Sequence, residues 1–158
     1  MDSARFTAEN LDGKSKRDGV EVELNSQLTD ALTLTGSYTY TDSRQPNATG
    51  GRSRELRRPK HMAAMNLNAS LLAGRANLNV NVSYTDDQRD RFFPPFPEDP
   101  QLVTLDSYVL VDITGSYRLN DNVEIYARAN NSFDETYQNV FGYRSPERAF
   151  YGGVRVKL

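Results

Sequence analysis

The end of the chain alternates strictly between apolar and polar positions. From residue 150 onward one set of alternate positions is apolar or glycine, and it comprises Phe150, Gly152, Val154, Val156 and Leu158. The other set comprises Tyr151, Gly153, Arg155 and Lys157. Successive side chains of a β-strand point to opposite faces, so this pattern predicts a strand with one apolar and one cationic face. Such a strand suits a barrel with lipid outside and water or polar packing inside.

The same alternation recurs along the chain and predicts about eight strands. It is cleanest where Leu78, Val80 and Val82 alternate with asparagines. The expected strands cover residues 4–11, 17–27, 31–42, 61–72, 75–85, 105–119, 122–132 and 150–158. The alternation of the first is short, and its register stays open.

The connections between these strands alternate in length. Short turns are expected at residues 28–30, 73–74 and 120–122, and long polar loops at 43–60, 86–104 and 134–147. Short turns at one rim and long loops at the other are typical of outer-membrane barrels, whose turns are periplasmic and whose loops are extracellular. The sequence therefore predicts an all-β, antiparallel, up-and-down transmembrane β-barrel in the bacterial outer membrane.

The alternation also assigns the two faces. We expect the lipid-facing set to include Val80, Val82, Val109, Val111 and Val154, and the inward set to include Asn79, Asn81, Asp112 and Arg155. Because open edges in lipid leave backbone groups unpaired, we expect closure by pairing of residues 5–10 with residues 151–158. Self-association through open edges is the alternative.

Composition leaves a soluble β-sandwich or soluble β-barrel binder open. The mean hydropathy is −0.68 and no run of 18 apolar residues occurs, so no transmembrane helix is expected. A membrane barrel passes this test because its apolar residues are interleaved with polar ones. The net charge of −2 gives no indication of nucleic acid as a partner, and the absence of cysteine excludes disulfides and thiolate metal sites.

Several motifs resemble the C-terminal barrel of TonB-dependent outer-membrane receptors of the cobalamin and siderophore type. They are Asn131-Ser-Phe-Asp-Glu-Thr-Tyr137, Phe141-Gly-Tyr143 with Arg148, Arg17-Asp-Gly-Val-Glu-Val-Glu23, Leu34-Thr-Gly-Ser-Tyr-Thr-Tyr40 and Arg58-Pro-Lys-His61. The chain departs from the family pattern at Ser132, where leucine is usual, at Glu147, where glycine is usual, and at Leu158, where an aromatic residue is usual.

This resemblance implies a role in the uptake of a scarce nutrient, cobalamin or an iron–siderophore. Family members hold a plug domain inside a barrel of about 22 strands. No plug, TonB-contacting box or signal peptide is recognised here, so we expect residues 1–158 to form one barrel domain cut from a larger receptor. Such a segment should not transport alone, and a small-molecule ligand is expected only for the full-length receptor. A small self-sufficient barrel with a structural or adhesive role is the rival within the membrane class.

Two loop segments are candidate contacts for an extracellular ligand or for lipopolysaccharide, alongside outer-membrane lipid. The first is basic and contains Arg52, Arg54, Arg57 and Arg58, since arginine binds phosphate through paired hydrogen bonds. The second is aromatic and contains Phe92, Phe93 and Phe96, which could stack on a ligand or cover the barrel mouth. A solvated loop is the plain alternative for the arginines.

No pattern indicates an enzyme. His61 is the only histidine and lacks an adjacent carboxylate, and no serine lies in a Gly-x-Ser-x-Gly elbow. We therefore expect no catalytic residues, no cofactor and no metal site.

Overall fold

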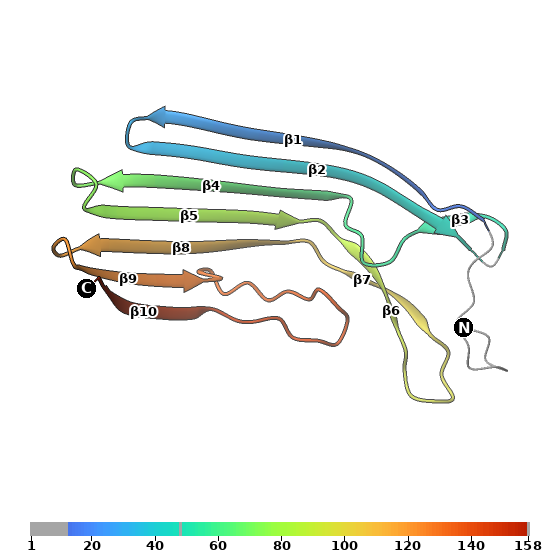
Figure 1. The fold of residues 1–158 in the computed structure, drawn as a ribbon. Coiled ribbons are helices and arrows are strands. Elements are labelled where there is room, and N and C mark those ends of the chain that lie inside the picture. Colours follow the sequence, from blue (N-terminus) through green and yellow to red (C-terminus); the bar gives the residue numbers. More distant parts are fainter. Residues whose placement is uncertain (1–12, 48, 158) are drawn as a thin grey trace.

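The computed structural model describes residues 13–47 and 49–157, and every regular element among them is a β-strand (Figure 1). The strands are β1 (Lys16–Thr29), β2 (Leu32–Pro46), β3 (Arg52–Arg54), β4 (His61–Leu71), β5 (Ala76–Thr85), β6 (Gln88–Phe92), β7 (Gln101–Leu105), β8 (Tyr108–Arg118), β9 (Val123–Asn130) and β10 (Ala149–Val156). No helix in the described part is long and apolar enough to cross a membrane.

Seven long strands form one antiparallel sheet in the order β1-β2-β4-β5-β8-β9-β10, so each pairs with its neighbour along the chain. These seven match seven of the expected strands, and the eighth, residues 4–11, lies outside the described residues. Figure 1 shows the short turns gathered at one end of the sheet and the long connections at the other, as expected.

The sheet register confirms the two faces. Val80 lies opposite Leu67 and Ile113, whereas Asn81 lies opposite Asn66 and Asp112. Alternate rows across the sheet are therefore apolar and polar, which fixes each side chain to one face. A register shift between Gln27 and Thr29 interrupts the pairing of β1 with β2 next to their turn.

The apolar face has no layer packed on it. In the described part of the chain Leu105 is the only buried apolar residue, whereas Val154 is 62% and Val22 55% exposed. A soluble sandwich would bury this face against a second sheet. An apolar face left bare suits contact with lipid, so the membrane prediction is favoured over the soluble alternatives.

The sheet is open within the described residues, because β1 pairs only with β2 and β10 only with β9 among the sheet strands. Antiparallel neighbours alternate in direction, so the first and seventh strands, β1 and β10, run the same way. An antiparallel closure between them requires an odd number of further strands. Direct pairing of β1 with β10, in one chain or between two copies, would be parallel.

Two expected loops contain strands. Residues 43–60 include the end of β2 and the short β3, and residues 86–104 include the hairpin β6–β7. In β6 the buried alternate positions are the polar Gln88 and Asp90, so a search for apolar alternation could not find this strand. The hairpin ends at Leu105, and β8 begins at Tyr108 instead of residue 105.

Candidate functional site

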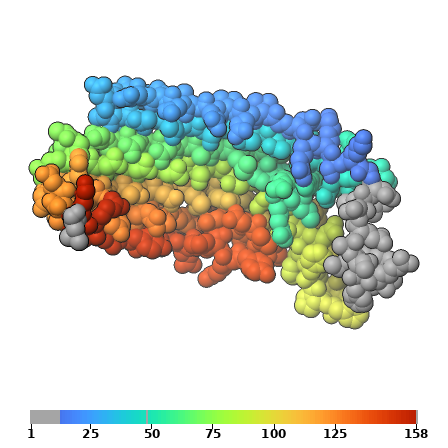
Figure 2. Space-filling view, in the orientation of Figure 1, coloured from blue at the N-terminus to red at the C-terminus, as the bar shows by residue number. Residues whose placement is uncertain are grey.

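Asp90 joins the long connections at the extracellular end of the sheet. Its carboxylate is 1% exposed and accepts hydrogen bonds from Arg57 Nε at 2.8 Å and from the amide of Phe141 at 2.9 Å. The amide of Arg91 also donates to it, at 2.8 Å. Arg57 follows β3 and Phe141 lies between β9 and β10, so one buried side chain of β6 holds two other connections in place. Figure 2 shows the β9–β10 loop lying beside this hairpin.

The hydrogen bonds to Asp90 favour its ionised form. Burial by itself would raise the pKa of Asp90, but the amide of Phe141, the guanidinium of Arg57 and the amide of Arg91 together hold that pKa below its ordinary value. Asp90 is therefore a buried carboxylate at neutral pH whose charge is balanced by a local arginine.

A second junction ties the start of β1 to the segment after β3. Glu55 accepts hydrogen bonds from Arg17 at 2.8 Å and from the hydroxyl of Ser43, which is itself buried. The bond from Arg17, followed by that from Ser43, lowers the pKa of Glu55. The extracellular ends of β1, β2 and β3 are thus linked by one carboxylate.

The four candidate arginines differ in how they are engaged. Arg54 donates to the carboxylate of Asp87 at 3.0 Å and to its carbonyl at 2.6 Å, and Arg57 is bound to Asp90. Arg58 lies at a loose 4.0 Å from Glu55. Arg52 is exposed and has no ion pair with any described residue. Arg54 and Arg57 therefore connect loops, and Arg52 and Arg58 are the two available to an outside molecule.

The candidate phenylalanines divide in the same way. Phe92 packs against Phe141, with ring centroids 5.0 Å apart. Phe93 is 67% and Phe96 98% exposed at the tip of the β6–β7 hairpin. The tip is held away from the loop junction and presents these two rings to its surroundings.

The Asn131–Tyr137 motif joins the two ends of the β9–β10 loop through hydrogen bonds, a role that the sequence did not reveal. Asn131 is buried, and its side chain bonds the amide and carbonyl of Glu135 and the carbonyl of Pro146. Asp134 accepts the amide of Arg148 at 2.9 Å. The two ends of the β9–β10 loop are joined by these bonds, which explains why the motif needs an asparagine and an aspartate at this spacing.

A groove lies between the β7–β8 junction and the β9–β10 loop, with a volume of about 420 Å³. It is lined by Asp106, Ser107, Tyr108, Glu135, Thr136 and Tyr137, among others. The rings of Tyr108 and Tyr137 are 4.5 Å apart, and the hydroxyl of Tyr108 donates to Asn139 at 2.8 Å. Tyr108 lies in the row of Thr85, so the groove belongs to the polar side of the sheet.

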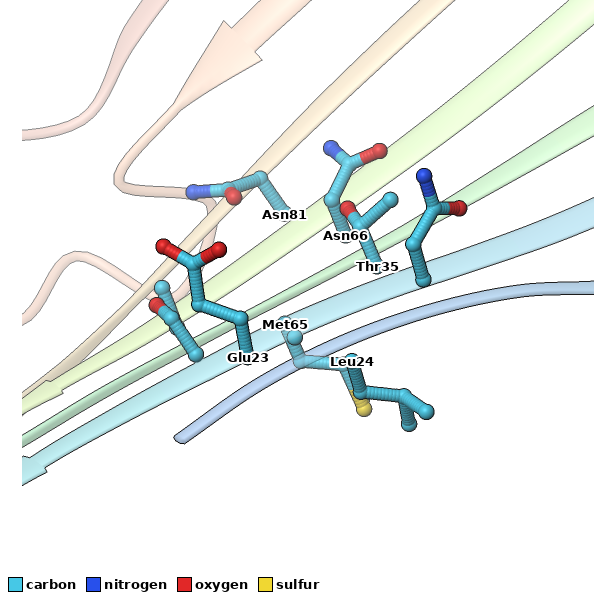
Figure 3. Close-up of a pocket in the computed structure, with 10 residues that line it drawn as sticks. Glu23, Leu24, Thr35, Met65, Asn66 and Asn81 are labelled. Carbon is cyan, nitrogen blue, oxygen red and sulfur yellow. The ribbon is translucent and has the colours of Figure 1, made fainter. Parts of the chain in front are cut away.

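A larger, shallow hollow of about 590 Å³ lies against the sheet itself, near β1, β2 and β4. Figure 3 shows Glu23, Thr35, Asn66 and Asn81 projecting to one side, while Leu24 and Met65 project to the other. Asparagine side chains on the polar face are hydrogen-bonded across neighbouring strands. Asn66 and Asn79 exchange two hydrogen bonds, and so do Asn68 and Asn77. The polar face is therefore a hydrogen-bonded wall suited to water or to a polar partner.

Comparison with known proteins gives one consistent result. The family model described as "TonB dependent receptor-like, beta-barrel" matches residues 1–132. The chain is 34% identical over 95 residues to the vitamin B12 transporter BtuB of Vibrio cholerae serotype O1, a match that covers 60% of this chain and 15% of that protein. It is 28% identical over 146 residues to an iron-regulated outer membrane virulence protein of the same serotype, covering 87% and 21%.

Solved structures share the fold at low identity. The ferripyoverdine receptor of the Pseudomonas aeruginosa outer membrane superposes with a TM-score of 0.77 at 17% identity, over 90% of this chain and 19% of that one. The siderophore receptor PiuA of Acinetobacter baumannii gives 0.71 at 22%, over 90% and 22%. The chain thus spans about a fifth or less of most of these relatives.

Proposed function

Because this chain belongs to the family of TonB-dependent receptor-like β-barrels, we propose that it forms wall and extracellular loops of a receptor for the uptake of cobalamin or an iron–siderophore. The chain is a β-barrel segment of the bacterial outer membrane. The observation that carries the proposal is the two-faced sheet with short turns at one end and interlocked loops at the other.

The nutrient is proposed from the ligands that the names of the similar proteins state. One is named a vitamin B12 transporter, and another is a receptor bound to ferripyoverdine. The exposed groups at the extracellular end, Arg52, Arg58, Phe93 and Phe96, are the proposed contacts to such a ligand or to lipopolysaccharide, since they combine cations with free aromatic faces. Arg54, Arg57 and Phe92 are assigned to holding the loops.

We also propose that the chain does not transport by itself. Seven described strands give an open wall, and a ligand pocket needs groups that converge from several sides. The residues form one structural unit in this proposal, a single domain of barrel wall whose partners are the outer-membrane lipids and further strands.

A chimeric receptor tests the wall. Residues 16–156 would replace the matching segment of the Vibrio cholerae vitamin B12 transporter, and heat-modifiable gel mobility would report assembly in the outer membrane. Assembly is expected, because the chain superposes on an outer-membrane receptor of the same fold with a TM-score of 0.77. Failure of the chimera to assemble, while the parent transporter does so in parallel, would contradict the proposal.

Uptake of labelled cobalamin by the assembled chimera then tests the ligand assignment. Transport supports cobalamin, and an assembled chimera that does not transport it would remove cobalamin from the proposal. Calorimetry on the isolated chain with cyanocobalamin and with ferripyoverdine should show no saturable binding. Sub-micromolar binding of either would overturn the claim that the segment is incomplete.

A further inference from the structure

We propose that the groove between the β7–β8 junction and the β9–β10 loop receives a cationic group of the transported ligand, such as an ammonium or guanidinium. This inference rests on the proposed uptake function and specifies the chemistry of one part of its site. The groove of about 420 Å³ is large enough for a side-chain-sized group and opens on the polar side of the sheet.

The charge of the groove is one-sided. Asp106 and Glu135 line it, and no lysine, arginine or histidine among the described residues does. Three carboxylates at the extracellular end, Glu55, Asp87 and Asp90, each have an arginine within 3.0 Å. Neither Asp106 nor Glu135 forms an ion pair with any residue that the structure describes. The described lining of the groove therefore carries negative charge and no positive charge.

The aromatic pair supplies a second element of cation recognition. Tyr108 and Tyr137 lie with their rings 4.5 Å apart and tilted by 35°, and both line the groove. The hydrogen bond from Tyr108 to Asn139 fixes one ring against the loop. A cation near an aromatic face is attracted by the ring quadrupole, and adjacent carboxylates add to that attraction. Hydroxyls of Ser107 and Thr136 can accept hydrogen bonds from an ammonium or guanidinium.

The same charge should exclude anionic groups from the groove. An anionic group placed between Asp106 and Glu135 would meet two like charges, and the described lining of the groove offers no cation to offset them. Anionic parts of a ligand must then be held elsewhere, and the exposed Arg52 and Arg58 lie on a different connection of the same rim. The groove thus distinguishes the cationic from the anionic end of one ligand.

Nitroxide probes of matched size test this on the full chain refolded in detergent micelles. One carries a trimethylammonium, one a hydroxyl and one a carboxylate, and NMR records the relaxation that each causes at the amides of residues 104–108 and 135–138. The amide of Arg91, which is bonded to Asp90 and does not line the groove, reports in the same spectra that the loop junction is formed. The cationic probe should relax the groove amides about threefold more than the anionic probe.

The variants separate the groove from general surface charge. In the double variant Asp106→Asn and Glu135→Gln the preference for the cationic probe should fall to that of the neutral probe. The matched control is Glu98→Gln with Asp99→Asn, two exposed carboxylates of the β6–β7 tip, which should leave the preference unchanged. Equal relaxation by cation and anion, or a preference that survives the groove variant, would overturn the proposal. Because no uptake is measured, failure here is distinct from failure of the chimera.

Discussion

The ring of Tyr126 in β9 lies over Gly153, its partner in β10. A Cβ atom at Gly153 would stand 2.5 Å from the Tyr126 hydroxyl oxygen and 2.6 Å from the carbon that bears it, which is too close for a real side chain. The guanidinium of Arg155 adds a contact at 5.7 Å from the same ring. The glycine thus makes room on the polar face for an aromatic ring that lies against the edge strand β10.

Replacing Gly153 should therefore destabilise the sheet. Gly153→Ala would force the exposed Tyr126 ring from its place, at a cost near the lower end of the range for overpacking, about 1 kcal/mol. Gly152→Ala is the matched control, because its added Cβ would meet the Tyr126 carbonyl at an ordinary 3.6 Å. Urea unfolding from lipid vesicles compares the two variants, and equal midpoints would contradict this role for Gly153.

An arginine should be tolerated on one face of β5 and not on the other. Val80→Arg places a charge on the apolar face near the middle of the strand and should cost about 2–4 kcal/mol of folding free energy in a bilayer. Asn81→Arg places the same group on the polar face opposite Asp112 and should cost far less. The measurement is folding yield and urea stability in vesicles. Similar losses for both variants would argue against lipid contact.

Acid should release the loop junction at Asp90. Since its folded pKa is lowered, its ionised form contributes stability above the unfolded value of about 3.9, and that contribution disappears as the pH falls through the lower folded pKa. The Phe141 amide signal in NMR should titrate with a midpoint below about pH 3.9. In Asp90→Asn this titration should vanish. A midpoint above the ordinary aspartate value would show that the carboxylate is not stabilised as described.

Arginines of the same rim should differ in their contribution to stability. Arg57→Gln leaves the buried carboxylate of Asp90 without its counter-ion and should cost about 1–3 kcal/mol. Arg52→Gln removes an exposed side chain with no ion pair among the described residues and should change stability by less than about 0.5 kcal/mol. Protease susceptibility of the loops provides the readout. If Arg52→Gln loosened the loops as much as Arg57→Gln, the Asp90 junction would lose its assigned importance.

The strands could be predicted because each long strand obeys one simple rule. Alternation placed the fifth expected strand at residues 75–85, and the structure has Ala76–Thr85. The hairpin β6–β7 was not predicted, because the buried alternate positions of β6 are polar. The ion pairs of Arg54 and Arg57 could not be predicted for a related reason. Their partners, Asp87 and Asp90, are brought close by that hairpin, which the sequence did not predict.

The closure of the sheet stays a prediction. Its proposed eighth strand lies outside the described residues. Because β1 and β10 run in the same direction, an antiparallel closure requires an odd number of further strands to bridge the open edges. One further strand would satisfy this condition and so would a larger odd set. The parity follows from counting paired strands, which the sequence alone could not provide while the first expected strand remained without a register.

Solvent accessibility along β5 and β8 tests the central claim, a barrel wall with lipid on one face, most directly. Single spin labels at each position of Ala76–Thr85 and Tyr108–Arg118 would be measured by EPR in bilayers, with oxygen and a water-soluble nickel complex as relaxants. Labels at Leu78, Val80, Val82, Val109 and Val111 should favour oxygen, and labels at Asn79, Asn81 and Asp112 should favour nickel, with a period of two residues. Uniform accessibility along both strands, or oxygen preference on the asparagine positions, would contradict it.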